Sequence, residues 1–453
     1  MTEESFKSKD FVKNQSEMCD KNDLITPELY TQYDVKKGLR DRYGKGVLTG
    51  LTNISRVDGF VNIDGVRTPC EGRLWYRGYD VIKMIKGRSN SRFGYEEATY
   101  LLLFGNLPSK QQLDDFKKVL VEYRVLPTTF TRDVIMKAHS KDIMNSITKS
   151  VLTLAAYDPN MSDCSIENVL RQCIWLISLF PMLAIYGYQA YSYYDCDNSL
   201  YLHRPDNSLS TSENILRMLR PDCKYTPLEA KVLDIALVLH MEHGGGNNST
   251  FTTRVVTSTG SDTYSVMAAA LSSLKGPKHG GANIKVMDMI ADIKANVSDT
   301  TDEKELSEYL EKILDKKAFD KAGLIYGMGH AVYSISDPRA VVFKSFVEEL
   351  AIAKDRHDDF KLFAAIERLA PDLIIAKKHN TTGVSANVDF YSGFVYSMLG
   401  IPQELYTPLF ATARIVGWSA HRIEELVNTG KIIRPAYQSV MSEREYIPID
   451  KRE

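Results

Sequence analysis

Residues 239–283 read LHMEHGGGNNSTFTTRVVTSTGSDTYSVMAAALSSLKGPKHGGAN, and three of the nine histidines of the chain lie in this segment. His240 and His243 follow an apolar run with helical spacing, so we place them at the end of a helix. Glycines 244–246 are expected to end that helix, because glycine adopts backbone conformations that other residues avoid. A polar ligand at such a helix end can contact ring nitrogens and main-chain N–H groups together.

A second helix is predicted over residues 262–274 of the same segment. Its small side chains at 268–270 favour close approach of a neighbouring helix. The helix is expected to end at Gly276-Pro277, directly before His279. The second histidine site therefore also lies at a helix end, beside glycine-rich backbone.

The spacing of His240 and His243 leaves three functions open. A zinc site is one of them, but no third ligand with metal spacing accompanies the pair, and H-x-E-H is not the H-E-x-x-H of metalloproteases. A structural role is another, because a histidine near a helix C-terminus interacts favourably with the helix dipole. His240 lies closer to the apolar face and is the better structural candidate. Substrate binding is the third.

Four other polar residues each have an ordinary structural interpretation. Asp389 lies in an apolar, turn-containing context where aspartate is usually a helix cap. Arg339 follows Asp337-Pro338, a good helix start, where an arginine opposes the helix dipole and is expected to have another partner. Arg414 lies in an apolar helix, either ion-paired or free to bind a carboxylate, and Arg434 reads as an exposed tail residue.

The segment 239–283 resembles the citrate synthase family, whose pattern is H-x-x-H followed by N-x-S-T-F and then L-K-G-P-x-H-G-G-A-N. Two further family patterns are present, GHAVY at 329–333 with DPRA at 337–340, and NVDFYSG at 387–393. The resemblance extends from about Gly38 to Pro435 and so covers most of the chain.

The resemblance implies condensation of acetyl coenzyme A with oxaloacetate, followed by hydrolysis of the thioester to citrate and coenzyme A. It assigns catalysis to three residues: His330 polarises the keto group, Asp389 removes a proton from the acetyl methyl group, and His279 donates to the thioester oxygen. An aspartate of ordinary pKa, about 3.9, is a weak base toward carbon, so stabilisation of the enolate must lower much of the barrier. No metal or redox cofactor is required, since the coenzyme A thioester is a substrate.

Oxaloacetate carries two carboxylates, which guanidinium groups bind bidentately. The resemblance implies His243, Arg339, Arg414 and Arg434 as substrate ligands, with Arg434 contributed by the partner subunit of a homodimer. Two alternatives remain open. A 2-methylcitrate synthase uses the same residues with propionyl coenzyme A, and one methylene changes discrimination by only about 1–3 kcal/mol. The remote alternative is a helical scaffold without turnover.

The fold is predicted to be mainly α. Dense turn residues between 36 and 82 indicate a small β-ribbon near the N-terminus, and capping patterns mark helix starts at Ser109 and Thr226. The resemblance implies a large helical domain of residues 1–283 and 401–453 and a smaller helical domain of residues 284–400, with hinges near 280–281 and 393–400. The later predicted helices cover residues 284–295, 302–315, 337–354, 360–377 and 403–427.

The composition is that of an ordinary globular protein of 453 residues. Its 56 basic and 58 acidic residues give a net charge of -2, which provides no overall field to attract nucleic acid or an anionic membrane. Six scattered cysteines without a C-x-x-C pair indicate reduced thiols and a cytoplasmic location. The first thirty residues lack the apolar core of a signal peptide, so the mature protein is expected to start near Met1. The apolar run 173–188 is shorter than the roughly 20 residues that span a bilayer and contains Pro181, which favours a buried, kinked helix.

Overall fold

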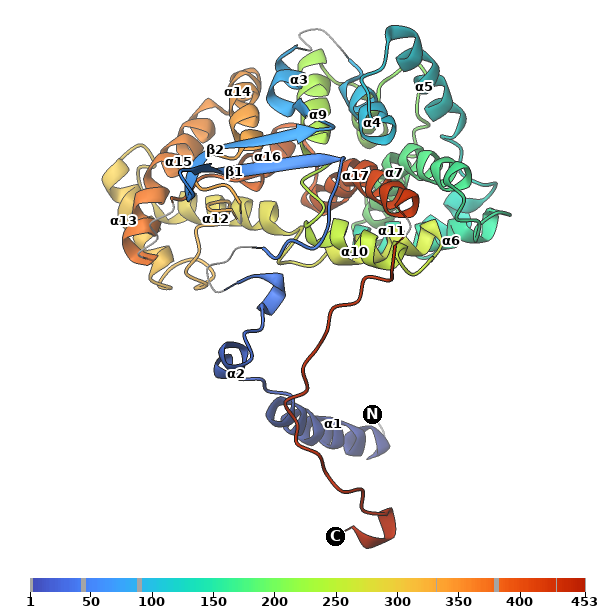
Figure 1. Ribbon diagram of the computed structural model, residues 1–453. Coiled ribbons are helices and arrows are strands. Elements are labelled where there is room, and N and C mark those ends of the chain that lie inside the picture. The colour runs from blue at the N-terminus through green and yellow to red at the C-terminus, as the bar shows by residue number, and fades with distance from the viewer. Residues whose placement is uncertain are drawn as a thin grey trace. The chain divides into compact units, whose positions relative to one another are not determined.

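The computed structural model describes residues 3–41, 46–87, 92–330, 332–378, 383–428 and 430–452. The chain divides into two compact units, Met1–Leu51 and Thr52–Glu453. The first unit holds three helical elements (Figure 1). The side chains of residues 10–22 in its longest helix are exposed. These elements are α1 (Glu3–Asn22), α2 (Pro27–Gln32) and the 3-10 helix η1 (Lys37–Leu39).

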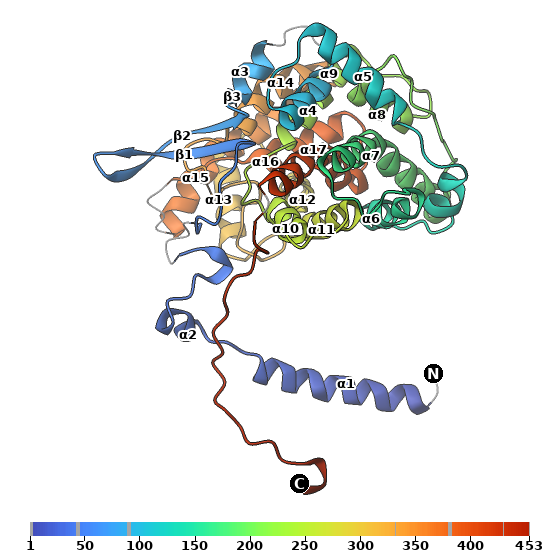
Figure 2. The same cartoon turned by 45° about the vertical axis from the view of Figure 1, so that its right-hand side comes forward.

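The second unit begins with the predicted β-ribbon. Its strands are antiparallel in the order β1 (Ser55–Ile63), β2 (Val66–Tyr76) and β3 (Tyr79–Asp80). The two residues between β1 and β2, Asp64 and Gly65, have φ angles of 51° and 82°, the geometry of a type I′ hairpin turn. The paired strands extend to one side of the helices (Figure 2).

The ribbon packs directly on the segment that precedes helix α14 (Pro338–Ala353). The Gly72 amide donates to the Ser336 carbonyl oxygen over 3.1 Å. A Cβ atom at Gly72 would lie only 2.0 Å from that oxygen, so this approach of two backbones requires glycine.

The rest of the second unit is helical, as predicted. Its first helices are α3 (Val81–Gly87), α4 (Gly94–Phe104), α5 (Lys110–Glu122), η2 (Thr131–Met136), α6 (Ile143–Leu154), η3 (Ala155–Tyr157), α7 (Ile166–Asp195), α8 (Thr211–Leu219), α9 (Pro227–His240), α10 (Asn248–Thr257) and α11 (Thr263–Leu274). The later ones are α12 (Ala282–Asn296), α13 (Glu303–Leu314), α14 (Pro338–Ala353), α15 (His357–Lys378), α16 (Val388–Met398), η4 (Gln403–Leu405), α17 (Tyr406–Val427) and η5 (Ile449–Lys451).

Helix α7 contains the apolar run 173–188. It is the one helix among the described residues that is long and apolar enough to cross a membrane, but 83% of its most apolar window is buried inside the protein. It continues through Pro181 and packs against α6, α8 and α17. The prediction of a buried core helix is confirmed.

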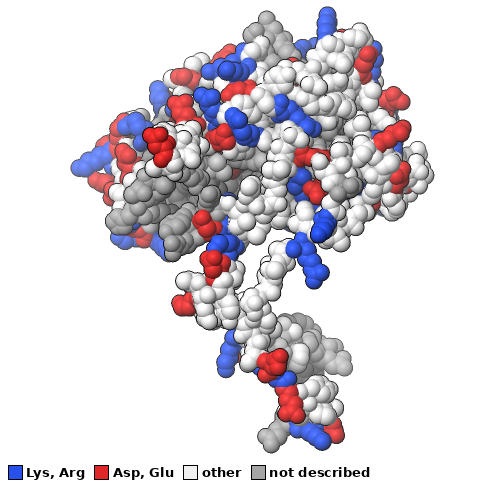
Figure 3. Space-filling view, viewed as in Figure 1, with Lys and Arg blue, Asp and Glu red and all other residues white. Residues whose placement is uncertain are grey.

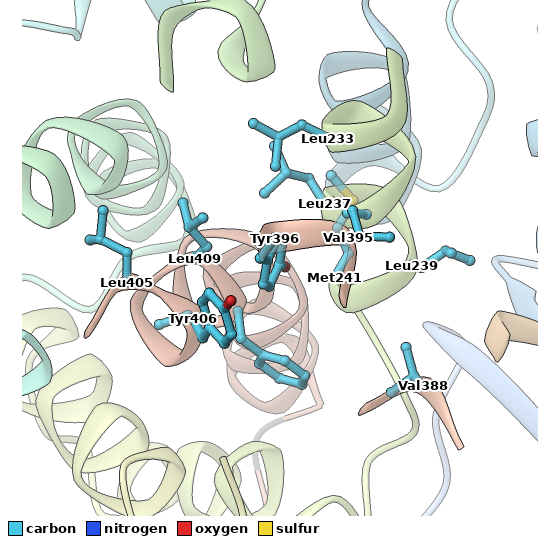
Figure 4. Close-up of a cluster of buried hydrophobic side chains, with 14 of the residues drawn as sticks. Leu233, Leu237, Leu239, Met241, Val388, Val395, Tyr396, Leu405, Tyr406 and Leu409 are labelled. Atoms are coloured by element: carbon cyan, nitrogen blue, oxygen red, sulfur yellow. The ribbon is translucent and has the colours of Figure 1, made fainter. Parts of the chain in front are cut away.

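Helices α9, α16 and α17 share a buried apolar cluster next to the polar residues discussed below. Leu237 of α9, Val395 and Tyr396 of α16 and Leu409 of α17 belong to this cluster (Figure 4). Helix α14 packs on both α9 and α16, and α12 packs on α16. The predicted division into domains at residues 283 and 400 stays a prediction.

Charged side chains are distributed without separation by sign on the face of the Thr52–Glu453 unit that Figure 3 shows. Basic and acidic residues alternate across it. This distribution agrees with the small net charge of the sequence.

Candidate active site

The turn that carries His243 follows helix α9. The side chain of Tyr76, from strand β2, ends that helix. The helix stops at His240, three residues earlier than expected from the glycines. The Tyr76 hydroxyl donates to the Val238 carbonyl over 2.9 Å and accepts from the Glu242 N–H over 3.3 Å. It therefore stands between the two groups that would form the next helical hydrogen bond, and the predicted helix end was wrong for this reason.

A buried carboxylate fixes the same turn. Glu242 accepts hydrogen bonds from the Ser55 hydroxyl (2.8 Å), the Gly244 amide (2.6 Å) and His421 Nε2 (2.9 Å). Arg254 approaches His421 Nδ1 at 2.7 Å and can only donate, so the His421 proton lies on Nε2. Burial raises the pKa of Glu242, but its partners, His421 foremost, outweigh burial and bring the pKa to about 2. The turn is thus held by an ionised group.

His243 and His330 lie next to each other, with Tyr333 beside both. The ring centroids of the two histidines are 5.1 Å apart, and His243 Nε2 is 3.2 Å from the Tyr333 hydroxyl. His330 Nδ1 accepts from the Val332 and Tyr333 amides at 3.0 and 3.2 Å. A neutral His330 therefore carries its proton on Nε2. Arg339 Nη2, also a donor, lies 3.5 Å from that atom, so the two groups do not hydrogen-bond to each other and an acceptor can serve both. Burial, helped by the charge of Arg339, lowers the pKa of His243 well below its usual range.

Arg339 joins this group through Asp337. Its guanidinium is 4% exposed and donates to both Asp337 oxygens, over 3.0 and 2.7 Å. Burial lowers the pKa of Arg339, but Asp337 outweighs burial and raises it. The Asp337 carboxylate also accepts from the Arg339 and Val388 amides. The partner expected for an arginine at a helix start is therefore Asp337, which caps α14 and reaches the first residue of α16.

Asp389 lies in the first turn of α16 and is not its cap. Asn387 is the cap, because its side chain accepts from the Asp389 amide over 3.0 Å. The interpretation of Asp389 as a helix cap was therefore wrong. No hydrogen bond among the described residues involves the Asp389 carboxylate, which is half-buried. Burial raises its pKa to about 6, against the lowering effect of Arg339 and Arg414.

Arg414 is a fully buried guanidinium with unused donors. Its Nε atom donates to the His240 carbonyl over 2.6 Å, while Nη1 and Nη2 have no partner among the described residues. Burial lowers its pKa to about 10. The ion-pair alternative fails within the described part of the chain, where no carboxylate bonds to Arg414. Because buried polar groups are nearly always hydrogen-bonded, the two nitrogens point to a missing acceptor.

His279 follows α11 and is held by a serine of α10. Its Nε2 atom is 3.2 Å from the Ser249 hydroxyl, which in turn accepts from Trp418 Nε1 over 3.2 Å. Burial lowers the pKa of His279 to about 4, and the charge of Arg414 adds to this effect. His279 is therefore neutral at pH 7.

His240 is fully buried and packs its ring 4.5 Å from that of Phe410. Neither of its ring nitrogens has a hydrogen-bond partner among the described residues, and the structural role expected for it stays a prediction. Arg434 is exposed in the segment after α17, and no hydrogen bond or ion pair in the described ranges involves it. Its assignment to a partner's site stays a prediction.

Sequence reasoning missed several residues that hold the site. Glu242 and Ser249 lie inside the quoted segment, within H-x-E-H and N-x-S-T-F, so their positions gave a signal. Tyr76 is 162 residues from Val238 along the chain, and His421 is 179 residues from Glu242. No local sequence pattern marks either residue. No group of three or more His, Cys, Asp or Glu side chains in the described ranges is arranged to hold a metal ion.

Comparisons with known proteins identify relatives over most of the chain. The family described as "Citrate synthase, C-terminal domain" matches residues 42–436. The chain is 31% identical to a citrate synthase of Synechocystis sp., over 90% of this chain and 92% of that protein. It is 32% identical to 2-methylcitrate synthase 2 of Corynebacterium glutamicum, over 93% and 99%.

A solved structure with a similar fold comes from Thermoplasma acidophilum. It is a citrate synthase in a ternary complex with carboxymethyl coenzyme A and oxaloacetate, with a TM-score of 0.74 and 28% identity over 92% of this chain and 99% of that one. From the extent of these matches, the chain belongs to the citrate synthase family of acyltransferases, which convert acyl groups into alkyl groups on transfer.

Proposed function

We propose that the protein condenses acetyl coenzyme A with oxaloacetate and hydrolyses the resulting thioester to citrate and coenzyme A. The observation that carries this proposal is the pair of nitrogens on the buried Arg414 guanidinium that have no partner in the part of the chain that the structure describes. A buried cation with free donors is suited to a carboxylate ligand, which satisfies both nitrogens at once.

Binding of oxaloacetate is the first step. Arg414 binds one carboxylate of oxaloacetate. Arg339 binds near the other end of the oxaloacetate molecule, and its Nη2 atom lies 3.5 Å from His330 Nε2. His243 and the protonated Nε2 atom of His330 face the keto group, whose oxygen accepts from His330. This donation withdraws electrons from the carbonyl carbon and prepares it for attack.

Carbon–carbon bond formation follows. The Asp389 carboxylate removes a proton from the acetyl methyl group, and the resulting enolate carbon attacks the keto carbon of oxaloacetate. The keto oxygen becomes a hydroxyl by taking the Nε2 proton of His330. His330 regains a proton from solvent and Asp389 releases the one that it took, so both residues return to their starting state. A pKa of about 6 makes Asp389 a stronger base than an ordinary aspartate while leaving it ionised at pH 7. Water then cleaves the C–S bond, and coenzyme A leaves as the thiol.

The enolate oxygen needs a donor, for which we propose His279. A neutral His279 can donate from Nδ1 only if its Nε2 atom accepts the Ser249 proton. The Ser249 hydroxyl can instead donate to Asn247 at 3.0 Å, and Trp418 already donates to its oxygen. The proposed role therefore requires Ser249 to donate to His279.

Binding of oxaloacetate without any thioester tests the role of Arg414. Replacement Arg414→Met should weaken oxaloacetate binding by about 100-fold or more, because bidentate carboxylate binding is lost. Arg422→Met is the matched control, since Arg422 is also buried in α17 but its nitrogens are all bonded, to Thr257, Thr263 and the Ser261 carbonyl. This control should lose stability and keep oxaloacetate binding. Equal affinity in wild type and Arg414→Met, measured by calorimetry, would refute the role.

The acyl donor is the open part of the proposal. Relatives of similar identity are named citrate synthase and 2-methylcitrate synthase, which supports propionyl coenzyme A as the alternative donor. Parallel measurement of kcat/KM with acetyl and propionyl coenzyme A decides between them, and we expect the acetyl value to be higher. A higher propionyl value would assign the alternative function. Inactivity with both would leave the non-catalytic scaffold.

A homodimer with shared sites and a cytoplasmic location also belong to this proposal. The exposed Arg434, without partners in its own chain among the described residues, supports the first. The cytoplasmic location rests on the cysteine pattern alone.

A further inference from the structure

Three helices that carry or adjoin residues of the candidate site also meet at their opposite ends. Helix α9 ends at His240, three residues before His243, whereas α14 and α16 begin at the site, with Arg339 and Asp389 in their first turns. Helix α14 packs on both of the other two. At a rise of about 1.5 Å per residue, their lengths of 14, 16 and 11 residues place the far ends about 16–24 Å from the site.

Glu229 lies at this far end, as the third residue of α9, and is 1% exposed. Its Oε1 atom accepts from Arg220 Nη2 over 2.7 Å and from Lys354 Nζ over 2.5 Å. Its Oε2 atom accepts from Arg220 Nη1 over 3.0 Å and from the Thr226 amide over 2.7 Å. Burial raises the pKa of Glu229, but the hydrogen bonds from Arg220 and Lys354 outweigh burial and bring the pKa to about 2. Glu229 is therefore ionised at neutral pH.

The two cations connect Glu229 to the other two helices. Lys354 is the C-cap residue of α14. Arg220, which follows α8, donates from Nη2 to the carbonyl oxygen of Leu399, the C-cap residue of α16, over 2.7 Å. A cation near a helix C-terminus also interacts favourably with the helix dipole. One buried carboxylate thus links the start of α9 to the ends of α14 and α16.

This cluster opposes displacement of the helices along their axes. A shift of α14 would separate Lys354 from a buried carboxylate, and a shift of α16 would separate Leu399 from Arg220. Both changes are unfavourable, because a buried charge that loses a partner keeps its desolvation cost without compensation. The cluster also joins residues on the two sides of the predicted domain boundary at residue 283.

We propose that Glu229 is a positioning residue that acts on the active site from this distance, by holding α14 through Lys354 and α16 through Arg220. Helix α14 carries Arg339, and α16 carries Asp389. The expected consequences rest on the proposed function, in which the arginine binds oxaloacetate and the aspartate removes the methyl proton. The two connections should therefore be separable, one acting on substrate binding and the other on turnover.

Three variants test this separation. Lys354→Met should weaken oxaloacetate binding, measured by calorimetry, about 10-fold, and should change kcat at saturating oxaloacetate much less. Arg220→Met should lower kcat about 10-fold and leave the oxaloacetate Kd within about twofold, because Asp389 does not bind oxaloacetate. Glu229→Gln, which keeps the shape of the side chain, should change both quantities. Lys354→Arg, which keeps the cation, should bind oxaloacetate nearly as well as wild type.

Glu213→Gln is the matched control. Glu213 is the third residue of α8, accepts from the Ser210 amide over 2.8 Å, and pairs with Arg92 over 2.7 and 3.0 Å. It therefore repeats the arrangement of Glu229 on a helix that carries none of the proposed site residues. Glu213→Gln should lower stability and leave both the oxaloacetate Kd and kcat unchanged.

A loss of stability in the three variants without any change in Kd or kcat would overturn the proposal, as would equal changes in Glu213→Gln. If Glu229→Gln does not fold, Lys354→Met and Arg220→Met decide. Hydrogen exchange gives a readout that needs no activity. The Arg339 amide, bonded to Asp337 over 2.9 Å, should exchange faster in Lys354→Met, and the Asp389 amide faster in Arg220→Met.

This readout distinguishes failure of the inference from failure of the proposed function. A wild-type protein that releases no thiol with either acyl donor would refute the proposed function alone, and faster exchange in the variants would still support the positioning role. Unchanged exchange of both amides would refute the positioning role, whatever the activity of the wild type.

Discussion

At the scale of single residues, burial changes the chemistry of Asp389 more than its sequence context suggested. The sequence implied an aspartate of ordinary pKa, about 3.9, acting as a weak base. In the structure its carboxylate has no hydrogen bond among the described residues, and burial raises its pKa to about 6. The surroundings therefore make Asp389 a stronger base. Burial of its charged carboxylate lowers the stability of the folded protein.

Asp389→Asn should separate the two effects. The pKa of Asp389 in the folded protein, about 6, lies above its ordinary value of about 3.9, so the stability associated with the protonated form is lost as the pH rises through about 6. At pH 8 the variant should be more stable than wild type, by on the order of 2 kcal/mol, while turnover falls about 100-fold or more. Chemical denaturation and steady-state kinetics measure the two.

Asn387→Ala is the control, because Asn387 is the actual cap of α16. It should lower stability by about 1 kcal/mol and leave most of the activity. A variant Asp389→Asn that keeps the wild-type rate would show that Asp389 is not the base.

The acid limb of the pH–rate profile gives an independent check. Asp389 must be ionised to act as a base, so kcat/KM should fall about tenfold per pH unit below an apparent pKa near 6. The pKa of His279 is lowered to about 4 and that of His243 well below its usual range, so neither should set this limb. A limb near pH 4 in protein that is still folded would contradict the account.

At the scale of elements, helix α17 packs directly against the turn that carries His243. A Cβ atom at Gly417 would lie 2.3 Å from the Met241 carbonyl oxygen and 2.5 Å from Glu242 Oε2. The helix can pack against the turn only because residue 417 has no side chain. The same helix supplies Arg414 and His421. One packing contact therefore sets the positions of these two residues relative to His243 in the turn.

Gly417→Ala should therefore disturb the site as well as the core. Because a carbonyl oxygen cannot move aside freely, we expect a loss of stability of about 1–3 kcal/mol and a raised KM for oxaloacetate. Gly87→Ala is the control, since a Cβ atom there has no neighbour within 4 Å among the described residues, and it should leave both quantities unchanged. An unchanged KM in Gly417→Ala would show that the turn does not depend on this contact.

Local signals predicted the elements well and their ends less well. The capping boxes at Ser109 and Thr226 are present, and aspartates cap the predicted helices that begin after residues 262, 302 and 337. The end of α9 was wrong because Tyr76, from the distant ribbon, replaces a helical hydrogen bond. Such an interruption depends on tertiary contact, which no local pattern records.

At the scale of the whole molecule, the family patterns named residues from distant parts of the chain, and the structure brings several of them together. His243, His330, Arg339 and Arg414 influence one another through contacts or charge, as the patterns implied. Arg434 is exposed and makes no hydrogen bond or ion pair with the described residues of its own chain. Sequence could name these residues because the motifs are ordered and long, but it could not show the Asp337 and Ser249 contacts that hold them.

Mixed dimers test whether Arg434 completes the partner's site. Homodimers of Asp389→Ala and of Arg434→Ala should each be nearly inactive. After joint unfolding and refolding, about half of the dimers would be hybrids with one intact site each, which restores about a quarter of wild-type activity. A mixture that contains hybrids by mass but recovers no activity would place Arg434 outside the partner's site.

Release of free thiol from acetyl coenzyme A, recorded continuously with and without oxaloacetate, is the decisive test of the proposed condensation. We expect that release requires both substrates, because the enolate formed at Asp389 is consumed only by attack on the keto group held by His330 and Arg414. Thiol release without oxaloacetate would indicate simple thioester hydrolysis. No release from folded protein with either acetyl or propionyl coenzyme A would contradict the account entirely.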